Sequence, residues 1–203
     1  MKHASISNDA SREAFPEAAA FIELLTRWNR AINLVGRGEI DRLAERHVVD
    51  SLELVALIRP ETARAIDLGS GAGFPGLILA AATGIPFDLI EADQRKAAFL
   101  REAGRVTGAP VQVHAIRIEA ADLPPAPLVT ARALAPLSRL LALAAPLLAP
   151  GGTALLPKGA KIDDELTQAR QEWHMRTETI PSRIAPGAVI LRITELARAP
   201  SRR

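Results

Sequence analysis

Hydrophobic positions in the first third of the chain follow a helical period. Between about residues 12 and 32, apolar residues recur every three or four positions, which places them on one face of a helix. These residues are Phe15, Ala18, Phe21, Ile22, Leu25, Trp28 and Ile32. A second helix is predicted from residue 39 to about 46, and a third from about 47 to 58, before Pro60. Residues 1–60 are therefore predicted to form an all-helical N-terminal cap.

From about residue 61, short apolar runs alternate with amphipathic stretches. The runs predict strands at 63–68, 86–91, 110–115, 127–132 and 151–156, and the stretches predict helices at 74–83, 94–107, 136–148 and 161–171. Such alternation is typical of a parallel α/β sheet. Two further runs, 173–181 and 187–195, flank Pro186-Gly187 and predict a terminal antiparallel hairpin. Residues 61–203 are therefore predicted to form one compact α/β unit behind the helical cap.

The segment from Ala65 to Gly76 is the main candidate for ligand binding. It predicts a short buried strand that contains Asp67 and breaks into a turn with glycines at 69, 71 and 73. Glycine allows positive φ and lets a ligand approach where a Cβ would obstruct it. A nucleotide-binding turn at the start of a helix is therefore expected.

Two ligand classes fit this turn. Gly71, Gly73 and Gly76 match the dinucleotide pattern G-x-G-x-x-G. A dinucleotide would bring a pyrophosphate to the helix N-terminus, where the carboxylate of Asp67 would repel it. S-adenosylmethionine has no phosphate and carries an ammonium and a sulfonium. The turn therefore favours a methyltransferase, and an NAD(P)-dependent oxidoreductase stays open as the alternative.

Four other predicted strand ends carry residues that suit a nucleoside site. Glu91 ends the second strand, where an acid can accept both ribose hydroxyls of an adenosine. Ile118 and Glu119 follow the third strand, where an apolar residue can press on an adenine face. Arg132 and Lys158 end the fourth and fifth strands at the same edge. Two positively charged side chains at one edge indicate that anionic groups bind nearby. RNA phosphates or the carboxylate of the cofactor would be such groups.

Composition narrows the class of protein. Hydrophobic residues make up 48% and charged residues 24% of the chain, which is ordinary for a soluble globular protein. The absence of cysteine excludes disulfides and thiolate sites, and four scattered histidines predict no metal site. The net charge of +2 is too small to indicate nucleic acid by itself. With no secretory signal and no membrane-spanning run, we expect a cytoplasmic protein that is monomeric and does not enter a membrane.

Together these residues resemble one family, the bacterial 16S ribosomal RNA guanine-N7 methyltransferases known as RsmG and formerly as glucose-inhibited division protein B. The resemblance spans nearly the whole chain. It is carried by Trp28-Asn29, Asn33-Leu34, Arg46-His47, Asp50-Ser51-Leu52, Asp67 to Gly76, Gln94-Arg95-Lys96, Phe99-Leu100-Arg101, Arg132-Ala133 and Lys158-Gly159. The R-H-x-x-D-S block combined with the G-x-G-x-G-x-P-G turn is specific, because a generic methyltransferase would share only the turn and the acid. Val35 and Arg192 depart from the Thr and Lys that are more usual in the family.

The resemblance implies a class I S-adenosylmethionine-dependent methyltransferase fold, with a Rossmann-like seven-stranded sheet. It implies S-adenosylmethionine as methyl donor and a guanine in a decoding-region loop of 16S rRNA, in the small ribosomal subunit, as acceptor. Added to Asp67, Gly71 and Gly73 of the turn, it places cofactor contacts at Gly69, Phe74, Glu91, Ile118, Glu119 and Arg132. It assigns catalytic roles at the acceptor pocket to His47, Asp50, Arg132 and Lys158, and RNA contacts to Ser51, Arg95, Lys96 and Lys158. A non-catalytic ribosome-binding protein with this fold stays open as a further alternative.

Overall fold

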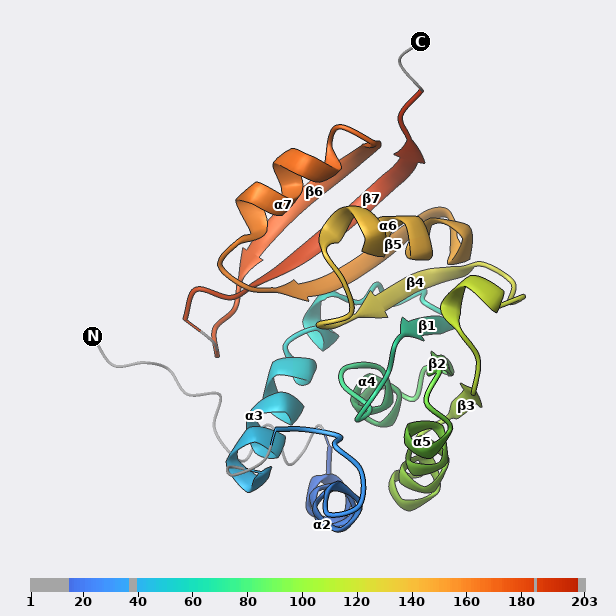
Figure 1. The fold of residues 1–203 in the computed structure, drawn as a ribbon, viewed down its shortest axis with the longest axis vertical. Helices are drawn as coiled ribbons and strands as arrows, with labels where there is room; N and C mark the ends of the chain where they lie inside the picture. The colour runs from blue at the N-terminus through green and yellow to red at the C-terminus, as the bar shows by residue number, and fades with distance from the viewer. Residues whose placement is uncertain (1–14, 37–39, 185, 201–203) are drawn as a thin grey trace.

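The computed structural model describes residues 15–36, 40–184 and 186–200. Within them, a seven-stranded sheet lies between two layers of helices (Figure 1). The strands are β1 Ala65–Leu68, β2 Phe87–Ile90, β3 Val111–His114, β4 Ala126–Ala131, β5 Leu148–Lys158, β6 Trp173–Pro181 and β7 Val189–Arg198. The fold is therefore the α/β architecture that the alternating pattern predicts.

The strand order is β3-β2-β1-β4-β5-β7-β6. Strands β1 to β5 run parallel, while β7 pairs antiparallel with both β5 and β6. The predicted terminal hairpin is confirmed, and its second strand lies between the first and the parallel sheet. The chain order reverses between β1 and β4, where Leu68 lies opposite Ala131. In open α/β sheets, ligands bind at the carboxyl ends of strands beside such a reversal.

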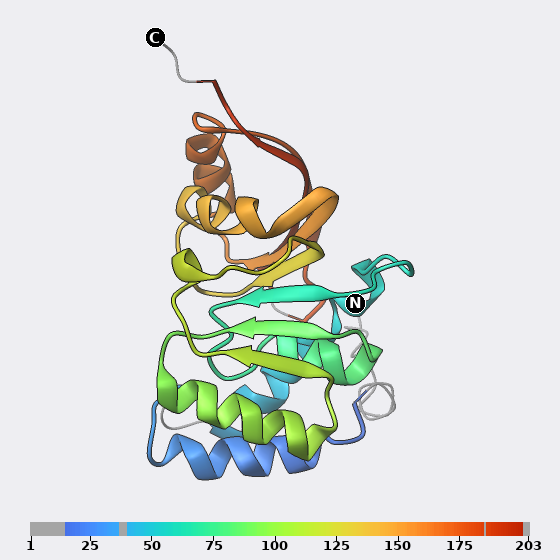
Figure 2. The same cartoon turned by 90° about the vertical axis from the view of Figure 1, so that its right-hand side faces the viewer.

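Helices cover the two faces of the sheet unequally (Figure 2). Of the helices in the described residues, four lie on one face: α2 Ala18–Asn29, α3 Ile40–Leu52, α4 Gly76–Thr83 and α5 Gln94–Thr107. Two lie on the other: α6 Leu137–Ala144 and α7 Ile162–Ala169. Three short 3₁₀ turns complete the described chain: η1 Val55–Leu57, η2 Ile118–Ala120 and η3 Ala145–Leu147.

The N-terminal helices share a hydrophobic core with the sheet. Phe21 of α2 packs edge-on against Phe74 of the glycine turn, with ring centroids 5.6 Å apart, and lies 6.2 Å from Phe99 of α5. All three rings belong to the core cluster that fills this face. The helical segment therefore helps to build the floor beneath the turn, and the predicted division of the chain at about residue 60 stays a prediction.

Most predicted elements after residue 61 are confirmed, but the helices before it differ. The predicted break between residues 46 and 47 is wrong, because α3 runs unbroken from Ile40 to Leu52. No glycine or proline interrupts the chain there, so nothing ends the helix. Helix α2 begins after Pro16, and residues 12–14 and 39 of the predicted helices lie outside the described residues.

One boundary in the second half also moves. The helix predicted to reach residue 148 ends at Ala144, and strand β5 begins at Leu148 instead of residue 151. Pro146 lies between them in the short turn η3, because proline cannot continue an α-helix.

Candidate functional site

The turn after β1 requires glycine. Gly69, Gly71 and Gly73 have φ values of +65°, +53° and +89°, a region that L side chains rarely adopt. A Cβ on Gly69 would lie 2.6 Å from Cδ1 of Leu134, so its absence lets the segment after β4 pack over the turn. A Cβ on Gly71 would meet nothing closer than 3.7 Å. The turn is therefore shaped by backbone conformation and is open above Gly71.

A cavity of about 430 Å³ lies over this turn, and we call it the turn cavity. Its walls are the turn from Gly69 to Ala72, the loop Leu34–Gly36 after α2, His47 of α3, and Arg132-Ala133 at the end of β4. Phe74 also lines it. The predicted turn, an aromatic residue and a strand-end cation thus meet in one hollow.

Asp67 lies beneath the turn and outside this cavity. Its side chain is fully buried, and Thr130 Oγ1 donates a 2.6 Å hydrogen bond to its Oδ1. A Cβ on Gly76 would lie 2.6 Å from Asp67 Cγ, so this glycine makes room for the carboxyl group. Burial raises the pKa of Asp67 to about 6, although the Thr130 hydrogen bond and the charge of Arg132 act to lower it. The carboxyl group therefore supports the turn from below, and the predicted contact of Asp67 with a cofactor stays a prediction.

Glu91 joins the turn to the start of α5. Its Oε2 accepts a 2.8 Å hydrogen bond from Gly71 N, and its Oε1 accepts one of 2.8 Å from Asp93 N. Asp93 in turn caps α5, since its side chain accepts from the backbone N–H groups of Arg95 and Lys96. Each carboxylate oxygen of Glu91 keeps a further lone pair, which could accept a ribose hydroxyl.

Arg132 is held by three neighbours at the edge of the sheet. Its guanidinium carbon lies 5.0 Å from the ring centroid of Phe74, and its Nη1 lies 2.9 Å from His47 Nδ1 and 4.0 Å from Asp50 Oδ2. Because a guanidinium can only donate, His47 Nδ1 is the acceptor of this hydrogen bond. Burial lowers the pKa of Arg132, while Asp50 and Asp67 act to raise it. His47, Asp50 and Arg132 thus lie together in one cluster, and their predicted catalytic roles stay predictions.

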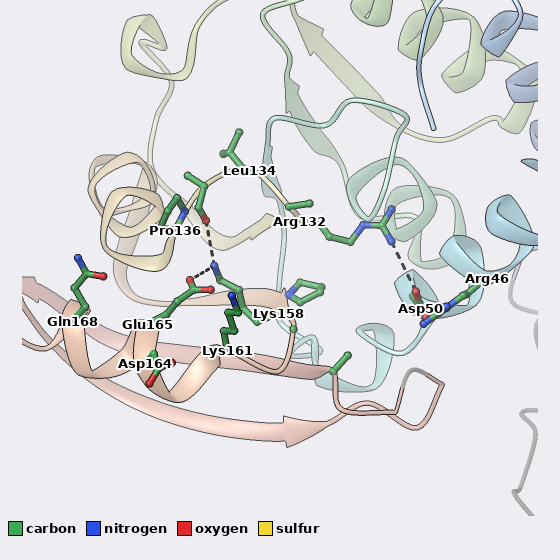
Figure 3. A pocket seen from close by; sticks show the side chains of 15 residues that line it. Arg46, Asp50, Arg132, Leu134, Pro136, Lys158, Lys161, Asp164, Glu165 and Gln168 are labelled. Atoms are coloured by element: carbon green, nitrogen blue, oxygen red, sulfur yellow. Dashed lines mark hydrogen bonds and ion pairs between the residues drawn. The ribbon is translucent and has the colours of Figure 1, made fainter. Parts of the chain in front are cut away.

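A second cavity of about 730 Å³ lies on the other side of Arg132, and we call it the charged cavity (Figure 3). Its walls come from α3, the segment after β4, the end of β5 and α7. Lys158 Nζ donates to Glu165 Oε2 at 2.6 Å and to the carbonyl of Ala135 at 3.2 Å. Glu165 Oε2 also accepts from Leu137 N at 2.8 Å. The cation of Lys158 is therefore balanced by a carboxylate of the protein itself.

The two cavities share Arg132 and Ala133. Ala133 has a φ of +51°, an uncommon conformation for a residue with a side chain. Such backbone strain concentrates at functional sites, where the surrounding structure holds it in place. A group bound over the glycine turn and a group bound beside Lys158 would thus meet at this short segment.

The remaining predicted site residues do not all face these cavities. Ser51 is buried and its hydroxyl donates to the carbonyl of His47 at 2.7 Å, and its RNA contact stays a prediction. Arg95 is exposed at the start of α5, and Lys96 beside it is half-buried. Glu119 is exposed and pairs with Arg139 at 3.5 Å, while Ile118 packs against the core. The roles of these four side chains stay predictions.

Sequence reasoning missed Glu165 and the loop Leu34–Gly36. Glu165 lies in the first turn of α7, where an acid is ordinary, so no local signal marks it as the partner of Lys158. The loop begins within the Asn33-Leu34 segment and comes after Trp28-Asn29, and these segments carry the family resemblance but suggest no role by themselves.

Two kinds of feature are absent from the described residues. Among them, no group of three or more His, Cys, Asp or Glu side chains is placed to hold a metal ion. Within the same ranges, none of the helices combines the length and the apolar character that crossing a bilayer requires.

Comparison with known proteins gives consistent results. The model of a family described as "rRNA small subunit methyltransferase G" (GidB) matches residues 15–185. A protein of Rhodospirillum centenum with the name "Ribosomal RNA small subunit methyltransferase G" is 56% identical over 188 residues, which cover 92% of this chain and 87% of that protein. One of the same name from Granulibacter bethesdensis is 53% identical, over 93% of this chain and 88% of its own.

Solved structures confirm the fold class. An O-methyltransferase from Bacillus cereus in complex with SAH superposes with a TM-score of 0.57, at 15% identity, over 87% of this chain and 91% of that chain. This likeness concerns the fold, which is the predicted class I methyltransferase architecture with its terminal antiparallel hairpin. The family match covers far more than half of the chain and agrees with relatives of over 50% identity. The chain therefore belongs to the rRNA small subunit methyltransferase G family.

Proposed function

We propose that this protein transfers a methyl group from S-adenosylmethionine to N7 of a guanine in a decoding-region loop of 16S rRNA, in the small ribosomal subunit. Membership of the family and the names of the relatives support the substrate class. The structural observation that carries the proposal is the junction of two cavities at Arg132 and Ala133. Methyl transfer needs donor and acceptor side by side, and this segment borders both.

The turn cavity suits the donor. It is open above Gly71, and Glu91 offers spare carboxylate lone pairs at the edge of the turn for ribose hydroxyls. Arg132 is a cation beside the turn that can hold the carboxylate of an amino acid. When bound, S-adenosylmethionine supplies an electrophilic methyl group. Gly69, Gly71, Gly73 and Phe74 shape its binding site, and Asp67 supports the turn from below.

The charged cavity suits the acceptor base. Guanine N7 has a lone pair and no proton to lose, so the site needs no general base. The chain then contributes mainly alignment, by holding N7 in line with the methyl group at near-attack distance. Asp50 lies beside the shared segment, where its carboxylate can stabilise the positive charge that develops on the guanine. His47 fixes the position of Arg132.

The RNA would contact both the charged cavity and the surface outside it. In A-form RNA, N7 lies in a deep narrow groove, so the target guanine is expected in a loop. The exposed Arg95 and the neighbouring Lys96 are the proposed contacts on α5, and Lys158 is the proposed contact inside the charged cavity. We further propose that the protein acts as a monomer in the cytoplasm.

Small ribosomal subunits that lack the modification provide the test. We expect incubation with labelled S-adenosylmethionine to label one guanine of 16S rRNA at N7. Labelling of no guanine would overturn the enzymatic proposal and favour a non-catalytic ribosome-binding protein. Calorimetry with both cofactors addresses the oxidoreductase alternative, since binding of NAD(P)H without binding of S-adenosylmethionine would overturn the proposed donor.

A further inference from the structure

Asn29, the last residue of helix α2, holds the loop that closes one side of the turn cavity. Its side chain is buried, and its Oδ1 accepts hydrogen bonds from Leu34 N at 2.7 Å and from Val35 N at 2.9 Å. Leu34, Val35 and Gly36 line the turn cavity. One buried oxygen thus fastens the backbone of a cavity wall.

The end of α2 is itself anchored to α5. Trp28 Nε1 donates to Glu102 Oε2 at 2.9 Å, and Arg27 Nη2 donates to Glu102 Oε1 at 2.7 Å. The Trp28 ring also meets Phe99 edge-on, with centroids 6.0 Å apart. Helix α2 therefore cannot shift along α5 without breaking these contacts.

The start of α5 is anchored to the glycine turn. Glu91 accepts hydrogen bonds from Gly71 N and from Asp93 N, and Asp93 caps α5. A continuous series of contacts thus runs from Asn29 through Glu102 to Glu91 and the turn. It fixes the distance between the loop Leu34–Gly36 and the floor of the cavity.

We propose that Asn29 is a positioning residue, which sets the width of the turn cavity and thereby the affinity for the S-adenosyl ligand. This inference rests on the proposed function, since it assigns that ligand to the turn cavity. Without an acceptor at residue 29, Val35 N would lose its partner and Leu34 N would keep only the carbonyl of Ile32, 2.9 Å away, so the loop would leave the position that lines the cavity. If Asn29 had a purely structural role, its substitution would lower the stability of the fold. It would not change the Kd for the ligand when that Kd is measured on fully folded protein.

Two substitutions of Asn29 separate these roles. Asn29→Leu keeps the volume and removes the acceptor, so we expect the Kd for S-adenosylhomocysteine to rise about tenfold, as expected for loss of buried hydrogen bonds. Asn29→Asp keeps an oxygen in place for both N–H groups and should bind within about twofold of wild type. Isothermal titration calorimetry of the full chain below its melting temperature gives both values.

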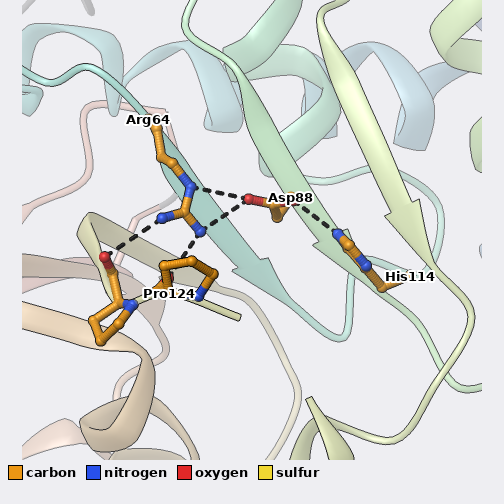
Figure 4. A network of polar contacts seen from close by, with 5 residues as sticks. Arg64, Asp88, His114 and Pro124 are labelled. Carbon is orange, nitrogen blue, oxygen red and sulfur yellow. Dashed lines mark hydrogen bonds and ion pairs between the residues drawn. The ribbon is translucent and has the colours of Figure 1, made fainter. Parts of the chain in front are cut away.

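The control for destabilisation is Arg64→Ala (Figure 4). Arg64 precedes β1, donates two 3.1 Å hydrogen bonds to Asp88 Oδ2, and donates to the carbonyl of Pro124 at 2.8 Å. His114 Nε2 lies 2.7 Å from the other oxygen of Asp88. This network lies at the opposite end of β1 from the glycine turn, so Arg64→Ala should lower the melting temperature while leaving the Kd unchanged.

Turnover gives a second readout. For Asn29→Leu we expect a raised KM for S-adenosylmethionine and a kcat within about twofold of wild type, because only binding of the donor is affected. If Asn29→Leu does not fold, Trp28→Phe removes the indole donor to Glu102 and should raise the same Kd about threefold, in the range of one hydrogen bond.

The outcomes distinguish this inference from the proposed function. Wild-type affinity in Asn29→Leu, or equal weakening in Asn29→Asp and Asn29→Leu, would overturn the role of Asn29 while leaving the function intact. A loss of affinity in Arg64→Ala as large as in Asn29→Leu would overturn it as well. Wild-type protein that does not bind S-adenosylhomocysteine would overturn both the donor assignment and this inference.

Discussion

The turn cavity and the charged cavity share Arg132 and Ala133 but are built from different parts of the chain. The floor of the turn cavity is one continuous segment, Gly69 to Ala72, whose shape follows from three left-handed glycines. The charged cavity is also bordered by a continuous segment, Arg132 to Pro136, but this segment contains no glycine. Its other walls come from α3, the end of β5 and α7, and its charges are held as the pairs Arg132–Asp50 and Lys158–Glu165.

This difference explains what each cavity can tolerate. A cavity that is formed by the backbone keeps one rigid shape. Such a shape suits a methyl donor, which is the same molecule in every reaction. A site built from ion pairs can exchange its partners, since an RNA phosphate could replace Glu165 beside Lys158. The comparison predicts that substitutions in the turn act on donor binding and that those in the charged cavity act on RNA.

The largest effect is expected for Gly71→Val. A valine at φ +53° is strained, and its side chain would occupy the open space above the turn. We expect S-adenosylhomocysteine affinity to fall by at least about 1,000-fold, measured by calorimetry. Gly108→Val is the matched control, because Gly108 has a φ of +64° with nothing within 4 Å and ends α5 away from both cavities. Equal loss in both variants would contradict a specific role for the turn.

Asp67 tests whether the floor of the turn cavity carries a buried charge. Its pKa in the folded protein, about 6, lies above the ordinary 3.8, so the folded state binds the proton more tightly than the unfolded state. Stability from this group is therefore present at low pH and is lost as pH rises from about 4 to about 6, by about 3 kcal/mol in total. Above about pH 6 the contribution is constant.

Denaturant unfolding at several pH values, compared with Asp67→Asn, measures this contribution. The variant has no carboxyl group to titrate, so its free energy of unfolding should lack the decline between about pH 4 and 6 that Asp67 causes in wild type. Parallel curves for the two proteins would show that Asp67 titrates normally.

Lys158→Ala tests the charged cavity. We expect KM for the small subunit to rise about tenfold, comparable to one charge-assisted hydrogen bond, with donor affinity unchanged. Arg176→Ala is the control, because it removes an exposed cation that pairs with Glu195 on the terminal hairpin. Unchanged turnover on RNA in Lys158→Ala would refute the placement of Lys158 in the acceptor half.

The smallest effect is expected for Ser51→Ala. The Ser51 hydroxyl is buried and donates to the carbonyl of His47 within its own helix. Its removal should change stability by less than about 1 kcal/mol and leave KM for the subunit unchanged, since RNA cannot reach it. A raised KM measured with small subunits would instead support the predicted RNA contact of Ser51.

Much of the fold could be predicted because its signals are local. Apolar periods marked the strands and helices from β1 to β7, and the glycines marked the turn. The boundary at residue 46 failed because no breaker stands there and α3 simply continues. The case for a cationic donor from Asp67 also weakens, since the carboxyl group lies beneath the turn and faces Thr130.

The sequence by itself determined the alternating architecture, the glycine turn and the strand-end positions of Glu91, Arg132 and Lys158. Each of these features is set by residues close together in the sequence. Those residues determine the local backbone conformation and the spacing of the hydrophobic positions. Only the tertiary structure decided that Lys158 meets Glu165, that Arg132 meets His47, and that Asn29 holds a cavity wall. Those pairings join side chains on different elements, and their distances follow from how the helices pack on the sheet, which no local pattern records.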